Sequence, residues 1–271
     1  MTTPPRSVAG SPAGDRPGPS APALPSVTAT TGSSLAVQVM AAVRRAITAG
    51  EMEPGRLYSV QQLASAMDVS RSPVREGLLR LGEAGLIRFH RNRGFEIVEV
   101  SPDDVAEIFA VRTALEVPAA RRAARLAAPE ELDRIRAQWE ALHEAARTGD
   151  LEATAEADEG LHRALLLVSG NAQAVQLVER LRTTTSFLGV VAATSRRPVG
   201  ELAREHDALV RAVLARDEAE AARAMREHLA STAQRLVAQA LRAQRTPEER
   251  LEELTAQVWG AAAAGYGEPG G

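Results

Sequence analysis

The 271-residue sequence has no cysteine and no lysine, and only 3% of its residues are aromatic. Because cysteine is absent, neither a disulfide nor a thiolate metal site is possible, and any metal must be bound by histidine and carboxylate groups. No apolar run approaches the roughly 20 residues of a membrane-spanning helix, and the N-terminus lacks the apolar segment of a signal peptide. We therefore expect a cytoplasmic protein with no membrane partner.

The residue types that are abundant favour helices. Apolar residues make up 45% of the chain, with alanine and leucine prominent, and arginine supplies all 32 basic side chains. These residues have high helix propensity, and the length suits two domains that each bury a core. The sequence predicts a mainly α fold with two folded domains.

Composition and periodicity divide the chain into four parts. Residues 1–33 are rich in Pro, Ser, Thr, Ala and Gly. Such a segment has too few large apolar side chains to offset the entropy lost on ordering, so we predict a disordered tail. Residues 34–100 and 101–244 are the two predicted folded domains. Residues 245–271 predict a short charged helix over 247–258 and then a second disordered tail.

The first folded domain has the pattern of a winged helix-turn-helix. Apolar spacing predicts helices over 35–47, 59–67 and 70–83, and the serines that begin the second and third are suited to the N-cap. Alternating apolar residues predict strands over 86–90 and 95–100, joined by a glycine-containing turn. Three helices followed by a small hairpin have the order of elements of this DNA-binding fold.

Positive charge is concentrated where this domain would meet DNA. The net charge of −3 argues against a nucleic-acid partner, but residues 71–93 hold six arginines and two glutamates. The first turn of the third helix can present hydroxyl and guanidinium groups to phosphates and guanine edges. Arginines on an isolated helix are more often only a solvated face, but the surrounding elements favour DNA recognition. The predicted DNA-binding residues are Ser70, Arg71, Ser72, Arg75, Arg93 and Gly94.

The second domain predicts an all-α bundle of six to seven helices. Ser101 and Pro102 are suited to the N-cap and first position of its first helix. Proline, glycine or aspartate separates each helix from the next. The predicted ranges are 102–127, 129–147, 150–168, 171–193, 199–215 and 217–244.

Three of the five histidines and one aspartate can form a metal site in this bundle. Asp158 and His162 are four residues apart and share one helix face, while His206 and His228 lie on two later helices. Facing helices of a bundle can bring such residues to one centre, and this donor set suits Zn or Ni. From the residues alone, a chance grouping is the alternative. The other two histidines are expected to be exposed.

Two stretches closely resemble a known family. The run Val69-Ser-Arg-Ser-Pro-Val-Arg-Glu76, followed by Gly85-Leu-Ile87, resembles the N-terminal domain of GntR-superfamily regulators. Residues 102–230, which include Asp158-x3-His162, are similar to the FCD ligand-binding domain of the FadR-type branch. The resemblance implies that the serines and arginines of the recognition helix contact operator DNA. It also implies that the aspartate and the three histidines bind a divalent metal.

The resemblance further implies a ligand and two residues that face it. The effector of many members is a small carboxylic acid. Arg112 can clamp such a carboxylate, or it can pair with Glu116 four residues later. Asn171 can line the pocket, or it can serve as a helix N-cap. One departure from the family pattern is Gly77, where alanine is usual, and this glycine costs about 1 kcal/mol of helix propensity.

Together these features predict a homodimeric transcription repressor. One recognition helix reads only a few base pairs, so we expect a dimer on a palindromic operator. We expect a small carboxylate, bound beside a divalent metal such as Zn, to release the dimer from the operator. Two alternatives stay open: the ion itself is the signal, or the bundle is a metal-dependent enzyme with Glu159 or Glu205 as acid or base. We expect no enzymatic activity.

Overall fold

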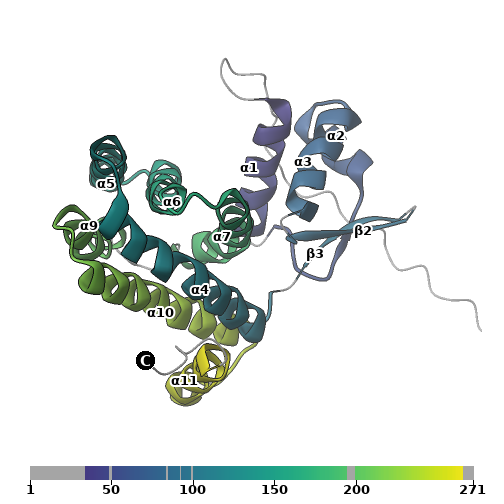
Figure 1. The fold of residues 1–271 in the computed structure, drawn as a ribbon. Helices are drawn as coiled ribbons and strands as arrows, with labels where there is room; N and C mark the ends of the chain where they lie inside the picture. The colour runs from purple at the N-terminus through teal and green to yellow at the C-terminus, as the bar shows by residue number, and fades with distance from the viewer. Residues whose placement is uncertain are drawn as a thin grey trace, which may run out of the picture.

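The computed structural model describes residues 34–48, 51–83, 85–91, 93–98, 100–193 and 199–264. The tail predicted for residues 1–33 and the last residues, 265–271, lie outside this part. Within it, a unit of three helices and a small sheet lies beside a larger helical bundle (Figure 1). The mainly α fold predicted from the sequence is confirmed.

The N-terminal unit contains three helices and a three-stranded antiparallel sheet of strand order β1-β3-β2. Its elements are α1 (Leu35–Thr48), β1 (Leu57–Tyr58), α2 (Val60–Met67), α3 (Arg71–Glu83), β2 (Ile87–His90) and β3 (Gly94–Ile97). The sequence did not predict β1, because two residues are too short to show an alternating pattern. Ser59 occupies the N-cap of α2 as predicted, but its side chain makes no capping hydrogen bond.

A single apolar cluster holds this unit together. The helices contribute fully buried side chains such as Val39, Leu63 and Leu78, and the sheet contributes Tyr58 and Phe95, whose rings lie 5.9 Å apart. Burying apolar area of this kind stabilises a fold by about 25 cal/mol per Å². The opposite faces of α3 and of the hairpin are therefore free to be polar.

Gly94 at the start of β3 is required by the sheet itself. Its φ of +108° lies in a region that side chains with a Cβ rarely adopt, and an added Cβ would lie 2.0 Å from the carbonyl oxygen of Tyr58. The absent side chain therefore lets β1 pair with β3. This gives the glycine a structural reason that does not depend on DNA.

The bundle contains eight helices in the described residues. They are α4 (Pro102–Leu126), α5 (Pro129–Thr148), α6 (Leu151–Leu167), α7 (Ala172–Ala193), α8 (Val199–Arg204), α9 (Asp207–Leu214), α10 (Glu218–Ala243) and α11 (Glu248–Ala264). Ser101 caps α4 as predicted, and its hydroxyl accepts a hydrogen bond from the backbone N–H of Asp104. The helix predicted over 199–215 is instead broken at Glu205 and His206.

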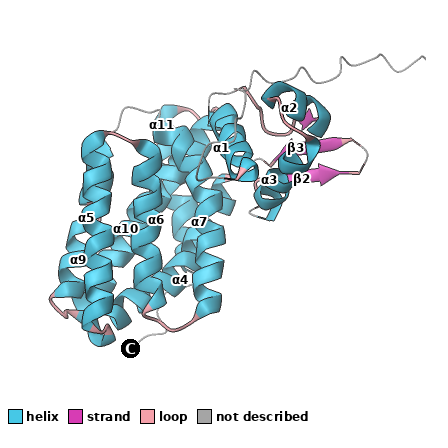
Figure 2. Ribbon diagram, turned by 90° about the horizontal axis from the view of Figure 1, so that it is seen from above, coloured by secondary structure: helices cyan, strands magenta, loops and turns pink. Residues whose placement is uncertain are grey.

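Helices α4 and α10 pack along each other at the centre of the bundle, and the other helices surround them (Figures 1 and 2). Helices α5 and α6 form an antiparallel pair on one side. Helix α7 lies between α6 and the N-terminal unit, where it contacts α1. No helix in the described part of the chain is long and apolar enough to span a membrane.

Helix α11 is longer than the sequence predicted. The prediction ended at residue 258 and assigned the following residues to a disordered tail, but the helix continues to Ala264. Its apolar side chains, including Leu251, Val258 and Trp259, pack against the bundle core beside α4 and α10. Tertiary packing therefore supports the helix past Gly260, which is a poor helix former.

Gly77 gives a first testable prediction, because α1 crosses α3 at this residue. A Cβ added at Gly77 would lie 2.7 Å from the carbonyl oxygen of Ala36. We expect Gly77→Ala to lower the free energy of unfolding by about 1–3 kcal/mol, as overpacking does, although alanine is the better helix former. Thermal and urea denaturation measure the change.

Gly260→Ala is the matched control, because this glycine also lies inside a helix, α11, but a Cβ there meets no atom within 4 Å. We expect it to raise stability by up to about 1 kcal/mol. A stabilising Gly77→Ala substitution would contradict the close helix crossing.

Candidate metal centre and DNA-facing surface

The exposed face of α3 carries the residues that the sequence predicted for DNA binding. Ser70 precedes the helix, and Arg71, Ser72 and Arg75 lie in its first two turns with exposed side chains. Val74 of the same helix is fully buried, so this stretch is held by its apolar side and offers its polar side to solvent. Packing therefore presents these hydroxyl and guanidinium groups together.

The arginines of this unit fall into two groups. Arg80 is paired with Glu76 at 2.7 Å, and Arg88 with Glu96 at 2.9 Å. Within the described ranges, Arg71 and Arg75 have no ion pair. Arg93, in the turn of the hairpin, is exposed. A guanidinium without an acidic neighbour can bind a phosphate or a base edge without first breaking an ion pair.

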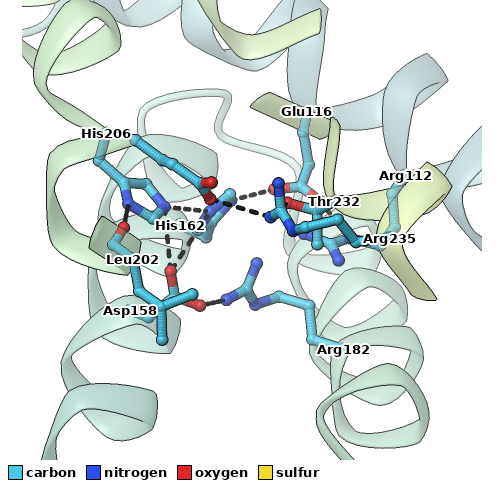
Figure 3. A network of polar contacts seen from close by, with 10 residues as sticks. Arg112, Glu116, Asp158, His162, Arg182, Leu202, His206, Thr232 and Arg235 are labelled. Carbon is cyan, nitrogen blue, oxygen red and sulfur yellow. Dashed lines mark hydrogen bonds and ion pairs between the residues drawn. The ribbon is translucent and has the colours of Figure 1, made fainter. Parts of the chain in front are cut away.

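The structure brings the three predicted histidines together in the bundle core. His162 lies on α6, His206 at the break before α9, and His228 on α10. One ring nitrogen of each lies within 4.8 Å of those of the other two. Asp158 joins them, because its Oδ1 is 2.9 Å from Nε2 of His206 and 4.0 Å from Nε2 of His162 (Figure 3).

Hydrogen bonds on the outer side of two rings fix the direction of their lone pairs. Nδ1 of His206 is 3.0 Å from the backbone carbonyl of Leu202, and because a carbonyl only accepts, this nitrogen is the donor. Nδ1 of His162 contacts the carboxylate of Glu116 in the same manner (Figure 3). Metal-binding histidines have outer partners of this kind, which orient the ring and fix the tautomer.

The inner nitrogens of these two rings then face each other. Nε2 of His162 and Nε2 of His206 are 3.2 Å apart, and both carry a lone pair when Nδ1 carries the proton. Such lone pairs repel unless a cation lies between them. Nδ1 of His228 is buried and has no hydrogen-bond partner among the described residues. The three imidazoles, with the carboxylate of Asp158 beside two of them, therefore fit a divalent metal ion.

Charges around the centre keep its groups in the forms that a metal needs. Burial, with Arg182 adding to it, lowers the pKa of His162 to about 4, so its ring is neutral at pH 7. Burial also lowers the pKa of His228. For Asp158, partial burial raises the pKa, but the charge of Arg182 outweighs this effect and holds the pKa well below its ordinary value.

Glu116 links the metal centre to α4. It is fully buried, and its Oε1 accepts a hydrogen bond of 2.6 Å from Nε of Arg112, while its other oxygen contacts His162. Burial raises the pKa of Glu116, but the charge of Arg112 and the hydrogen bond from His162 overcome this effect and place its pKa well below the usual range. The carboxylate is therefore ionised inside the bundle core.

Arg182 on α7 is a member of the site that the sequence reading missed. Only 5% of the residue is exposed, and its Nη2 contacts Oδ2 of Asp158 (Figure 3). Its Nε is buried and has no hydrogen-bond partner within the described ranges. Nothing in the sequence singles it out, because it lies 24 residues after Asp158 on another helix.

The two residues predicted to face the effector lie in different surroundings. Arg112 is buried, pairs with Glu116 and lies over the ring of Phe109 at 4.6 Å, which is the ion-pair alternative stated above. Asn171 is exposed at the start of α7, and its side-chain oxygen accepts from the backbone N–H groups of Gln173 and Ala174 at 3.1 Å. Asn171 therefore caps α7, which is one of the two roles predicted for it from the sequence.

The two remaining histidines are half-buried rather than exposed. His143 lies 2.8 Å from Asp207, which also accepts a hydrogen bond from Trp139 at 3.0 Å. His90 in the hairpin lies 3.1 Å from Glu96. Neighbouring acidic groups cover part of both rings, which the periodicity of single helices and strands did not indicate.

A winged helix-turn-helix with an exposed arginine-bearing helix, joined to a helical bundle with a buried histidine centre, defines a transcriptional regulator. Residues 35–97 match the family described as "Bacterial regulatory proteins, gntR family", and residues 107–231 match the FCD domain. The chain belongs to the GntR family of transcriptional regulators and carries an FCD domain.

Relatives and solved structures agree with this assignment. The chain is 28% identical to the HTH-type transcriptional repressor RspR of Escherichia coli, over 71% of this chain and 84% of that protein. It is 32% identical to the HTH-type transcriptional regulator LutR of Bacillus subtilis, over 66% and 91%. The solved structure of E. coli McbR/YncC shares the fold, with a TM-score of 0.61 at 23% identity over 75% of this chain and 97% of that chain. These proteins and families are transcriptional regulators, not enzymes.

The buried ion pair on α4 gives a second prediction. Glu116→Gln keeps the shape of the side chain but leaves the guanidinium of Arg112 buried without a counter-charge. Breaking one partner of a buried pair costs about 3–5 kcal/mol, so we expect a loss of that size in the free energy of unfolding. Urea denaturation of the metal-free protein measures it.

Glu144→Gln is the control for this measurement, because Glu144 pairs with Arg147 at 2.6 Å but both side chains are exposed. Solvent screens such pairs, and we expect almost no change. Equal effects of the two substitutions would show that the Arg112–Glu116 pair does not stabilise the bundle.

Proposed function

We propose that this regulator is a repressor that binds its operator as a homodimer and is released by a small carboxylate bound beside a divalent metal ion. Residues 34–100 form the DNA-binding domain and residues 101–244 the ligand-binding domain. The observation that carries the proposal is the pair of facing Nε2 atoms of His162 and His206, 3.2 Å apart, with outer hydrogen bonds that turn both lone pairs inward.

In this proposal the first turns of α3 read the operator. The contacting groups are those of Ser70, Arg71, Ser72 and Arg75, with Arg93 and Gly94 of the hairpin beside the DNA backbone. Exposure of these side chains and the free guanidinium groups of α3 support the assignment. Two such domains are needed because one recognition helix covers only a few base pairs. The assignment as a repressor agrees with RspR, which is named a repressor.

The metal is held by Asp158, His162, His206 and His228, and we propose Zn, with Ni as the other candidate. When bound, it supplies a Lewis-acidic centre with open positions for a carboxylate oxygen. Neutral imidazole rings support this assignment. The carboxylate of Glu116, which contacts the outer nitrogen Nδ1 of His162, also supports it. If the ion is itself the signal, chelation alone abolishes operator binding.

The recognition helix gives a third prediction. We expect Arg71→Ala to weaken binding to the operator at least tenfold while leaving the thermal midpoint unchanged, because the side chain is exposed and makes no ion pair within the described ranges. Fluorescence anisotropy measures the affinity, with the intergenic DNA next to the protein's own gene as the probe and unrelated DNA as the competitor.

Arg80→Ala is the matched control on the same helix, because Arg80 is already paired with Glu76. We expect its effect on affinity to be less than about threefold. An unchanged affinity of Arg71→Ala, or equal losses in both variants, would contradict the assignment of the first turns of α3 to the operator.

The metal centre gives a fourth prediction. Each single alanine variant removes one proposed metal ligand, so it should lose most of the bound metal in elemental analysis after dialysis. The four variants replace Asp158, His162, His206 and His228. His143→Ala is the control, because this ring contacts Asp207 and lies outside the cluster. Full occupancy in one of the four variants would remove that residue from the ligand set.

A further inference from the structure

Arg182 contacts one oxygen of the Asp158 carboxylate, whose other oxygen faces the histidines. Oδ1 of Asp158 lies 2.9 Å from Nε2 of His206, while Oδ2 contacts Nη2 of Arg182 (Figure 3). The guanidinium therefore supplies the positive charge that compensates this carboxylate in the metal-free centre. A divalent ion bound between the histidines and Asp158 would take over that role.

The charges of the centre balance only when no metal is bound. Two arginines, Arg112 and Arg182, face two carboxylates, Glu116 and Asp158, and the sum is zero when the three histidines are neutral. A divalent ion adds two positive charges to a buried site. Uncompensated charge in such surroundings is costly, so the loaded centre requires an anion.

Arg182 is the group best placed to receive that anion. The Arg112 guanidinium is already held by Glu116 through Nε at 2.6 Å, and it lies over an aromatic ring. The Nε of Arg182, by contrast, is buried and unsatisfied among the described residues, and its only ion pair there is the one that the metal would replace. A planar guanidinium with a free edge matches a carboxylate bidentately.

We propose that Arg182 and the metal ion compete for Asp158, and that Arg182, once displaced, binds the carboxylate of the effector. This inference rests on the metal centre proposed above and adds its regulation. Metal and effector then bind in order, because the ion frees the guanidinium that the effector needs. Arg182 lies on α7, the helix that contacts α1 of the DNA-binding unit, so the exchange takes place on an element that reaches that unit.

The test compares full-length wild type with Arg182→Gln and Arg182→Lys. Zinc affinity is measured by competition with a chromophoric chelator in buffer without carboxylates. We expect Arg182→Gln to bind zinc at least fivefold more tightly, because nothing competes for Asp158. The second readout is the thermal shift of the zinc-loaded proteins with acetate, succinate and citrate as probes. We expect Arg182→Gln to need at least tenfold more carboxylate for the same shift.

The opposite changes in zinc affinity and carboxylate affinity distinguish this role from structural damage, because a misfolded site would weaken both zinc and carboxylate binding. Arg182→Lys keeps the charge but not the bidentate edge, and should give intermediate values in both measurements. Arg163→Gln is the matched control, because Arg163 also joins α6 to α7, through Glu179 at 3.0 Å, but its side chain is exposed. We expect it to behave as wild type.

Several outcomes would overturn the proposal. Equal or weaker zinc binding by Arg182→Gln would exclude the competition for Asp158. The carboxylate role would be excluded if the thermal shift of that variant with the carboxylates equalled that of wild type. It would also be excluded if wild type showed no thermal shift with any of the three. Failure of the proposed metal centre is distinguishable, because wild type itself would then bind no zinc, whereas failure of the Arg182 role alone leaves zinc binding by wild type intact.

Discussion

The contact between the buried carboxylate of Glu116 and Nδ1 of His162 is the interaction on which the site depends. It joins α4 to α6, the helix of Asp158 and His162, and it holds the inner nitrogen of His162 toward His206. An ionised carboxylate in an apolar core is stable only with compensating charge, which Arg112 supplies at 2.6 Å. The apolar surroundings of α4 and α10 raise the strength of this pair and make its loss costly. The bundle core therefore positions the proposed metal ligands through charge as well as through packing.

Much of the fold follows from local sequence, and its exceptions have physical causes. The start of α4 is encoded within four residues, since Ser101 and Asp104 complete a capping box. By contrast, β1 depends on pairing with β3, and the end of α11 depends on packing against the core. The break between α8 and α9 was also unpredicted, because the apolar spacing continues across it. There the ring of His206 bonds to the carbonyl of Leu202, and the turn delivers the ring to the metal centre.

The candidate site was predictable only where its members share a helix or a motif. Asp158 and His162 could be paired by spacing, and the family resemblance added the two later histidines. Glu116 carried one usable signal, because it lies with Arg112 on the face of α4 that is otherwise apolar, which indicates a buried pair. Arg182 carried none, since its partner is on another helix. Its contact with Asp158 is visible only in three dimensions. For Asn171, the structure shows the capping role, which is one of the two that the sequence offered.

The arrangement of helices explains how a small change at this centre can reach DNA. Helix α4 carries Arg112 and Glu116, and only four residues separate its start from the end of β3 in the hairpin. Helix α7 carries Arg182 and contacts α1, which belongs to the DNA-binding unit. Both helices that hold the buried arginines thus meet that unit, one through the chain and one through packing. In the proposed mechanism, a ligand that changes the partner of either arginine alters the relative stability of two arrangements of the same helices, and this difference is the free energy available for control of DNA binding. Because the arginines are buried, that difference is not screened by salt as it would be at the surface.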